Sequence, residues 1–202
     1  MFVWKTALGT LLHPADTFYE IKRNNAGSVL IATIFLTVWY AFKIIGFSSG
    51  FIFNTASMSE SNAWYALAQT YGLVILFTLA NWAVCTLMEG KGKLKDIYVV
   101  VCYSLIPMIF QSVAYDVLSN VLTLNESNIL SIVNYVCIVF TLIIIVMGLI
   151  NIHEYSFGKF VFTTVVTALA MILIVFLVFM LAILLQQTKN FVETVYLEAF
   201  FR

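Results

Sequence analysis

The chain has 202 residues, of which 62% are hydrophobic and 10% are charged. A soluble domain of this size usually carries about a quarter charged residues, so the composition excludes an ordinary soluble protein and indicates a membrane-embedded chain. Ten basic and ten acidic side chains cancel to a formal net charge of zero. This balance excludes a basic face of the kind that binds nucleic acid, and the length suits one helical domain over residues 1–202.

The first 28 residues are expected to lie along the cytoplasmic surface of the membrane. Apolar residues recur at helical spacing up to Leu12, and Pro14 is suited to open a second short helix that carries Phe18 and Ile21. The alternative is that this segment packs against the rest of the protein.

Five long apolar stretches follow. A helix needs about 20 residues to cross a hydrocarbon core of about 30 Å. The stretches are continuous rather than alternating, which favours helices over the strands of a barrel. The predicted fold is an all-α membrane protein, a bundle of five transmembrane helices with short interfacial helices at both ends. The predicted spans are residues 29–47, 65–88, 97–118, 129–150 and 160–185.

The last segment, residues 186–202, places Phe191, Val195 and Tyr196 on one helical stripe, with Glu193 and Glu198 off it. We expect this tail to rest on the outer membrane surface as a separate short helix. Packing against the bundle is the alternative here too.

Basic residues occur in alternate connections between the spans. The connections 48–64 and 119–128 contain no Lys or Arg. Short connections rich in Lys and Arg remain cytoplasmic, so the amino terminus is predicted inside and the carboxyl terminus outside. The residues that carry this prediction are Lys5, Lys22, Arg23, Lys91, Lys93, Lys95 and Lys159.

Lys91, Lys93 and Lys95 lie within five residues between the second and third spans. They are candidates for docking a partner protein. They are equally candidates for contact with anionic lipid headgroups, at about 1 kcal/mol each near the surface.

Polar residues near the opposite boundary suggest an intramembrane pair or pocket. Lys43 and Asp116 fall at similar depth, and an outward-facing pocket could include Gln69, Gln111 and Asn134. The alternative, which we favour, is that the two charged side chains each reach the headgroups while the amides bond across helices.

Four residues at the cytoplasmic side are candidate metal ligands: His13, Glu89, His153 and Glu154. They come from separate segments and lack a spacing typical of metal sites, so solvated loop charges are the favoured interpretation. Cys85, Cys102 and Cys137 fall inside apolar runs, where no disulfide or metal cluster is expected.

Pro107, in the middle of the third span, removes a helix hydrogen bond and predicts a kink.

The segment "EGKGKLKD" is not a phosphate-binding loop because it lacks the preceding strand and the spacing. No catalytic motif is present, so neither enzymatic activity nor a cofactor is expected. The segment "EGKGKLKDIYVVV" shows weak internal similarity to "EYSFGKFVFTTVV".

Four segments carry a family resemblance: "HPADTFYEIK", "EGKGKLKDIYVVVCYSLIP", "SNVLTL" and "NIHEYSFGK". Together they resemble the bacterial branch of the Yip (Ypt-interacting protein) domain family over about residues 5–185. The resemblance implies a five-span domain with a cytoplasmic amino terminus in a bacterial cytoplasmic membrane. Eukaryotic members bind prenylated Rab-type GTPases. This sequence lacks their long amino-terminal region and DLYGP-type motif, so GTPase binding is not expected.

Two functions follow as expectations. The preferred one is a non-enzymatic accessory or scaffold subunit of a membrane complex associated with transport. Its partners would be lipids, another membrane protein such as a transporter, and further copies of the same chain in a homo-oligomer. The alternative is a stand-alone transporter or channel for ions or lipids. Such a path needs polar residues at mid-depth, which are scarce in this sequence.

Overall fold

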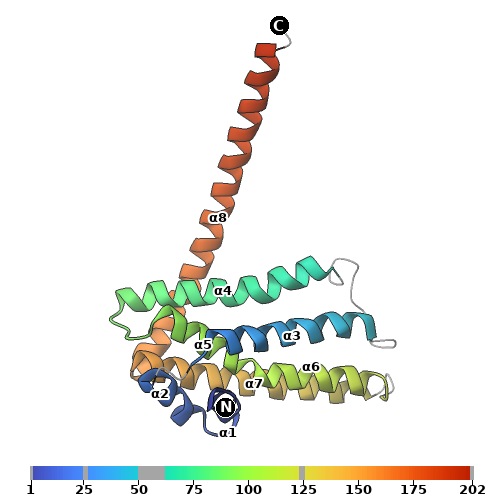
Figure 1. Cartoon of the computed structure of the whole chain (residues 1–202), viewed down its shortest axis with the longest axis vertical. Coiled ribbons are helices and arrows are strands. Elements are labelled where there is room, and N and C mark those ends of the chain that lie inside the picture. Colours follow the sequence, from blue (N-terminus) through green and yellow to red (C-terminus); the bar gives the residue numbers. More distant parts are fainter. Residues whose placement is uncertain (1, 25–26, 50–61, 123–125, 201–202) are drawn as a thin grey trace.

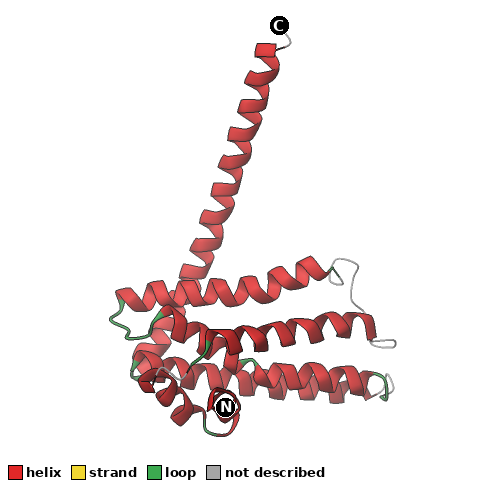
Figure 2. Ribbon diagram, viewed as in Figure 1, coloured by secondary structure: helices red, strands yellow, loops and turns green. Residues whose placement is uncertain are grey.

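The computed structural model describes residues 2–24, 27–49, 62–122 and 126–200. Within these ranges the protein is built from helices and short connections, with no strand (Figure 2). Five helical segments are long and apolar enough to cross a membrane, as the sequence predicts. The fold is therefore an all-α bundle of five membrane-spanning segments.

Two short helices precede the first span: α1 (Phe2–Leu12) and α2 (Pro14–Asn24). Pro14 opens α2, because a proline at the first helical position loses no hydrogen bond. The buried face of α2 carries Phe18 and Ile21, and α2 packs on α7 (Ser127–His153). The Phe18 ring lies so close to Gly148 of α7 that a Cβ there would be 3.0 Å from it.

The helices that follow are α3 (Val29–Ser49), α4 (Ala63–Leu87), α5 (Leu94–Ser104), α6 (Ile106–Ser119) and α7 (Ser127–His153). Figure 1 shows α3, α4, α6 and α7 side by side. The helix α3 packs on α4, α5 and α6, whereas α7 packs on α6, α5 and α2.

The third span is divided at Leu105 into α5 and α6, and Pro107 lies in the first turn of α6. Proline fits the first turn of a helix but not its interior, so the chain begins a new helix there. Val100, Cys102 and Tyr103 of α5 have no exposed surface. The middle of the core is therefore this short helix.

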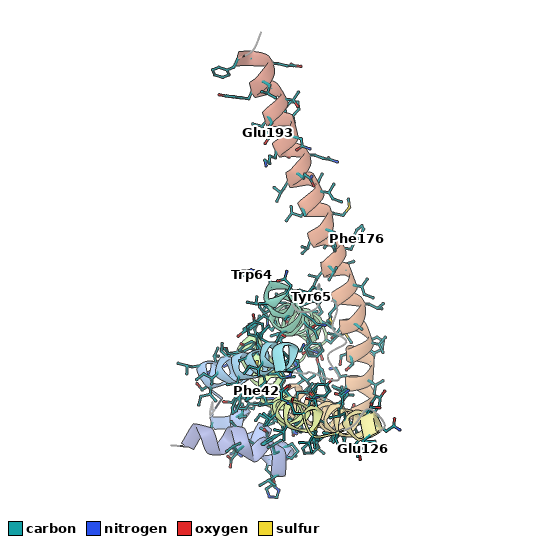
Figure 3. All side chains as sticks on the ribbon, turned by 90° about the vertical axis from the view of Figure 1, so that its right-hand side faces the viewer. Phe42, Trp64, Tyr65, Glu126, Phe176 and Glu193 are labelled. Carbon is teal, nitrogen blue, oxygen red and sulfur yellow. The ribbon has the colours of Figure 1, made fainter. Side chains whose placement is uncertain are left out.

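The last helix, α8 (Phe157–Phe200), is one uninterrupted run of 44 residues. Its first turns pack on α4 through Phe160, Thr163 and Thr167. The rest leaves the bundle at a steep angle, and the part around Glu193 stands clear of the other helices (Figures 1 and 3). The expected separate tail helix is instead a continuation of α8, because no Gly or Pro follows Gly158.

Candidate functional site at the lysine end of the bundle

One end of the bundle gathers lysines from separate elements. α4 and α7 finish at this end, where α5 and α8 begin. We call it the lysine end and define it by Lys22, Lys91, Lys93, Lys95 and Lys159.

The helices α4 and α7 terminate in the same way at the lysine end. Glu89 (φ 58°) and Glu154 (φ 56°) both take the left-handed conformation. The next residue donates its backbone N–H five residues back in each case, Gly90 to the Cys85 carbonyl at 2.7 Å and Tyr155 to the Ile150 carbonyl at 3.2 Å. This hydrogen bond is typical of the Schellman motif. The two segments with weak internal similarity therefore each begin at a helix end of the same conformation.

The carboxylate of Glu154 lies between two ammonium groups. Lys22 Nζ donates to Oε1 at 2.7 Å, and Lys91 Nζ donates to Oε2 at 2.5 Å. These two hydrogen bonds, with the charge of Lys22, lower the pKa of Glu154 from 4.5 to about 2. We call Lys22, Lys91 and Glu154 the triad. It joins α2, the α4–α5 connection and the end of α7.

A buried polar network lies next to the triad. His153 is 2% exposed, and its Nε2 lies 3.1 Å from Asn81 Oδ1. Asn81 Nδ2 in turn donates to Thr167 Oγ1 at 3.5 Å, so the network links α7, α4 and α8. The interpretation of His153 as a solvated loop residue therefore does not hold. The Asn81 amide pairs with Nε2 of the imidazole, which lowers the cost of burying both groups, whereas Nδ1 has no hydrogen-bond partner within the described residues.

The α4–α5 connection covers this histidine closely. A Cβ on Gly92 would lie 2.6 Å from His153 Cε1, and one on Gly90 would lie 2.8 Å from Nδ1. The Tyr155 ring stacks on the imidazole with centroids 5.2 Å apart, and its hydroxyl donates to the Met88 carbonyl at 3.3 Å. Burial raises the pKa of Tyr155. The two glycines of "EGKGK" were the sequence signal for this packing, since only they leave room for the ring.

The four candidate metal ligands do not converge. His13 is exposed between α1 and α2, while Glu89 and Glu154 are exposed and His153 is buried. Within the described ranges, no group of three or more His, Cys, Asp and Glu side chains could hold a metal ion. The three cysteines are free thiols.

At the opposite end of the bundle, Lys43 Nζ donates to Gln69 Oε1 at 3.3 Å and lies 4.8 Å from the Trp39 ring centroid. Asp116 approaches the same helix at Gly46, where a Cβ would be 2.9 Å from its Oδ1. The structure thus brings Lys43 and Gln69 together.

Gln111 and Asn134, the other two residues of the expected pocket, lie partly buried on α6 and α7.

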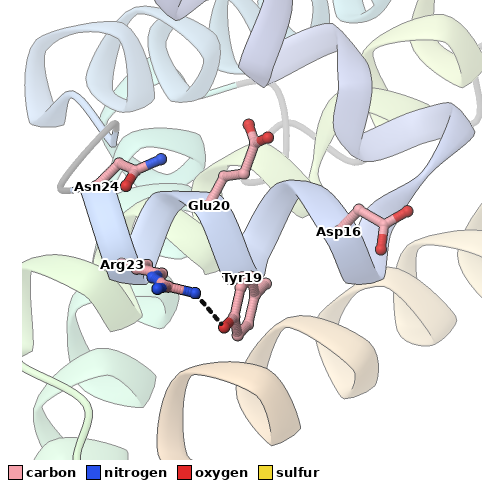
Figure 4. Close-up of a pocket in the computed structure, with 5 residues that line it drawn as sticks. All are labelled: Asp16, Tyr19, Glu20, Arg23 and Asn24. Carbon is pink, nitrogen blue, oxygen red and sulfur yellow. Dashed lines mark hydrogen bonds between the residues drawn. The ribbon is translucent and has the colours of Figure 1, made fainter.

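A surface hollow that the sequence did not indicate lies on the outer side of α2 (Figure 4). Arg23 donates to the Tyr19 hydroxyl at 3.0 Å, and two acidic side chains lie on the same helix. The mixture of charges favours no single ligand class. The lining residues are Asp16, Tyr19, Glu20, Arg23 and Asn24.

The chemistry available at the lysine end is recognition of negative charge. Lys91, Lys93 and Lys95 are exposed. Hydroxyl groups inside the bundle are mostly used by their own helices, as when Thr78 donates to the Val74 carbonyl and Ser104 to the Val100 carbonyl. Such hydroxyls stabilise helices and do not act as nucleophiles without an adjacent base.

The comparison with known families agrees with this architecture. The Yip1 domain matches residues 8–180. This range includes α2 to α7, the first part of α8 and the whole lysine end. No curated protein and no solved structure matches the chain. With five apolar membrane-crossing segments and a family match over most of its length, this chain is an integral membrane protein that belongs to the Yip1 domain family.

Proposed function

We propose that this protein is a non-enzymatic accessory or scaffold subunit of a membrane complex associated with transport. The lysine end faces the cytoplasm and docks the partner, which is another membrane protein. The observation that carries the proposal is the organisation of this end, where Glu154 joins two lysines from different elements above the buried His153–Asn81 pair.

Rigidity supports a docking role for this surface. The buried network ties α4, α7 and α8 together, and the Gly90–Gly92 connection packs directly on His153. A surface held in one conformation loses little entropy when a partner binds. Lys93 and Lys95 have no ion pair recorded in the described part of the chain and extend from this rigid base.

Co-purification tests the proposal. The tagged full chain is cross-linked in native membranes and purified, and the bound membrane proteins are identified. A variant with Lys91, Lys93 and Lys95 all changed to Gln should lose the partner. Lys189→Gln on the far part of α8 is the matched control and should retain it. Equal recovery of the partner from both variants would contradict docking at the lysine end.

The second candidate is a stand-alone transporter or channel for ions or lipids. The contact between Lys43 and Gln69 favours it, because polar pairs inside membrane proteins often mark a path. If the purified chain alone moves ions or lipids in liposomes, and Asp116→Ala abolishes the movement, this candidate replaces the first. A small GTPase is not the expected partner in either case.

A further inference from the structure

The Glu154 carboxylate occupies the position that an external anion would take between Lys22 and Lys91. Each of its oxygens accepts from a different ammonium group, at 2.7 Å and 2.5 Å. The two lysines come from α2 and from the α4–α5 connection, so neither is a helical neighbour of the glutamate. Bracketing of this kind is how lysines bind phosphate oxygens.

The backbone conformation of Glu154 indicates that its side chain has a function other than ending the helix. The left-handed position after a helix is usually taken by glycine, since other residues are strained there. Ending α7 would therefore be easier with Gly at this position. Glu89 has the same backbone conformation but no ion pair recorded among the described residues. Of the two, only Glu154 neutralises lysines of the lysine end.

The Glu154 carboxylate of the triad can also be replaced by an external anion. The side chains of Lys91 and Glu154 are 66% and 50% exposed, whereas the Lys22 side chain is 19% exposed. An ion pair as exposed as that between Lys91 and Glu154 contributes little to stability, so a stronger anion can displace the carboxylate from Lys91 without unfolding the protein.

Two exposed apolar side chains at this end point to a lipid as the source of that anion. Leu87 at the end of α4 is 84% exposed, and Phe157 at the start of α8 is 69% exposed. Acyl chains would cover both, which places the headgroup layer at the level of Lys22 and Lys91.

We propose that Lys22 and Lys91 form a binding site for the phosphate of an anionic lipid, and that Glu154 is an internal competitor that holds the site closed. A phosphomonoester headgroup, as in phosphatidic acid, suits the site best because it carries more negative charge than the carboxylate it replaces. The inference rests on the proposed function, in which the lysine end is the docking surface. Lipid binding there would release α2 and the α4–α5 connection from Glu154.

Lipid binding to the full chain in detergent tests the site. Native mass spectrometry gives the affinity for short-chain phosphatidic acid, phosphatidylglycerol and phosphatidylcholine, and inorganic phosphate is titrated separately. Glu154→Gln should tighten phosphatidic acid binding about fivefold or more, since each released lysine adds about that factor. The double variant Lys22→Gln/Lys91→Gln should lose the preference for phosphatidic acid.

Glu89→Gln is the matched control, because it changes the net charge equally at the same end and in the same backbone conformation. It should leave the affinity within about twofold. Glu154→Gly, which suits the left-handed backbone, repeats the test if the Gln variant folds poorly. Equal tightening by Glu89→Gln and Glu154→Gln would overturn the proposal, and so would inorganic phosphate binding as tightly as phosphatidic acid. Either result would leave the co-purified partner unchanged, whereas failure of docking would appear as equal recovery of the partner from the triple lysine variant and from the Lys189→Gln control.

Discussion

The hairpins α4–α5 and α7–α8 begin alike and end differently. Each starts with a helix that stops at a left-handed glutamate, Glu89 or Glu154, with the same backward hydrogen bond. After that, α5 enters the centre of the bundle, whereas α8 leaves it beyond Thr167 (Figure 1). The local sequence determines how a helix ends, but the neighbouring helices determine where the next one goes.

The surroundings of the two following helices explain the divergence. α5 touches α3, α4 and α7, and Val100 and Tyr103 are completely buried. α8 is mainly in contact with α4, and its residues 168–185 are apolar on every side. A helix that is apolar all round is stable in hydrocarbon without protein neighbours.

The largest expected effect contrasts one glycine from each hairpin. Gly92→Ala should lower the free energy of unfolding by about 1–3 kcal/mol, since the new Cβ would lie 2.6 Å from His153. Gly158→Ala meets nothing within 4 Å and should be neutral or stabilise α8 by up to about 1 kcal/mol. Denaturant unfolding in detergent measures both, and equal losses would contradict the close packing of the α4–α5 connection.

The second largest expected effect concerns the hydrogen bonds of Asn81, which link the two hairpins. Asn81→Ala removes the amide that pairs with His153 and Thr167, and should cost about 1–2 kcal/mol. Thr167→Val keeps the size of the side chain and the His153 contact, so its cost should be clearly smaller. If the Thr167 variant is the less stable one in the same unfolding assay, the network is centred on α8 rather than on His153.

The two glutamates provide a smaller and more specific contrast. Glu89→Gly should stabilise the protein by about 1 kcal/mol because it relieves a left-handed backbone. Glu154→Gly relieves the same conformation but loses both lysine contacts, so it should stabilise less. Thermal unfolding midpoints of the two variants compare them, and a larger gain for Glu154→Gly would show that the triad contributes nothing.

The smallest effect concerns pH. The pKa of Glu154 is lowered to about 2 in the folded protein, against an ordinary value of 4.5. The carboxylate therefore stabilises the fold fully above pH 4.5, and this contribution disappears as the pH falls toward 2. The difference in unfolding midpoint between wild type and Glu154→Gln should shrink over that interval. A constant difference from pH 6 to pH 2.5 would contradict the ion pairs.

The sequence predicted the membrane-crossing segments because hydrocarbon imposes continuous apolar runs of fixed minimum length. It also predicted the start of α2 at Pro14 and a kink at Pro107, near which the structure divides the third span into two helices. It did not predict the burial of His153, since that depends on Asn81, which lies 72 positions earlier. The continuation of α8 through 186–200 was missed because amphipathic spacing alone does not separate two adjoining helices.

Cysteine accessibility in intact cells tests most directly the claim that both hairpin connections lie together on the cytoplasmic side. The three native cysteines are replaced by alanine, and single cysteines are placed at Lys93 and Ser156 in the two connections, or at Asn62 and Asn120 at the other end. A membrane-impermeant maleimide should label positions 62 and 120 and leave 93 and 156 unlabelled until the cells are opened. Labelling of position 93 or 156 in intact cells would contradict the account.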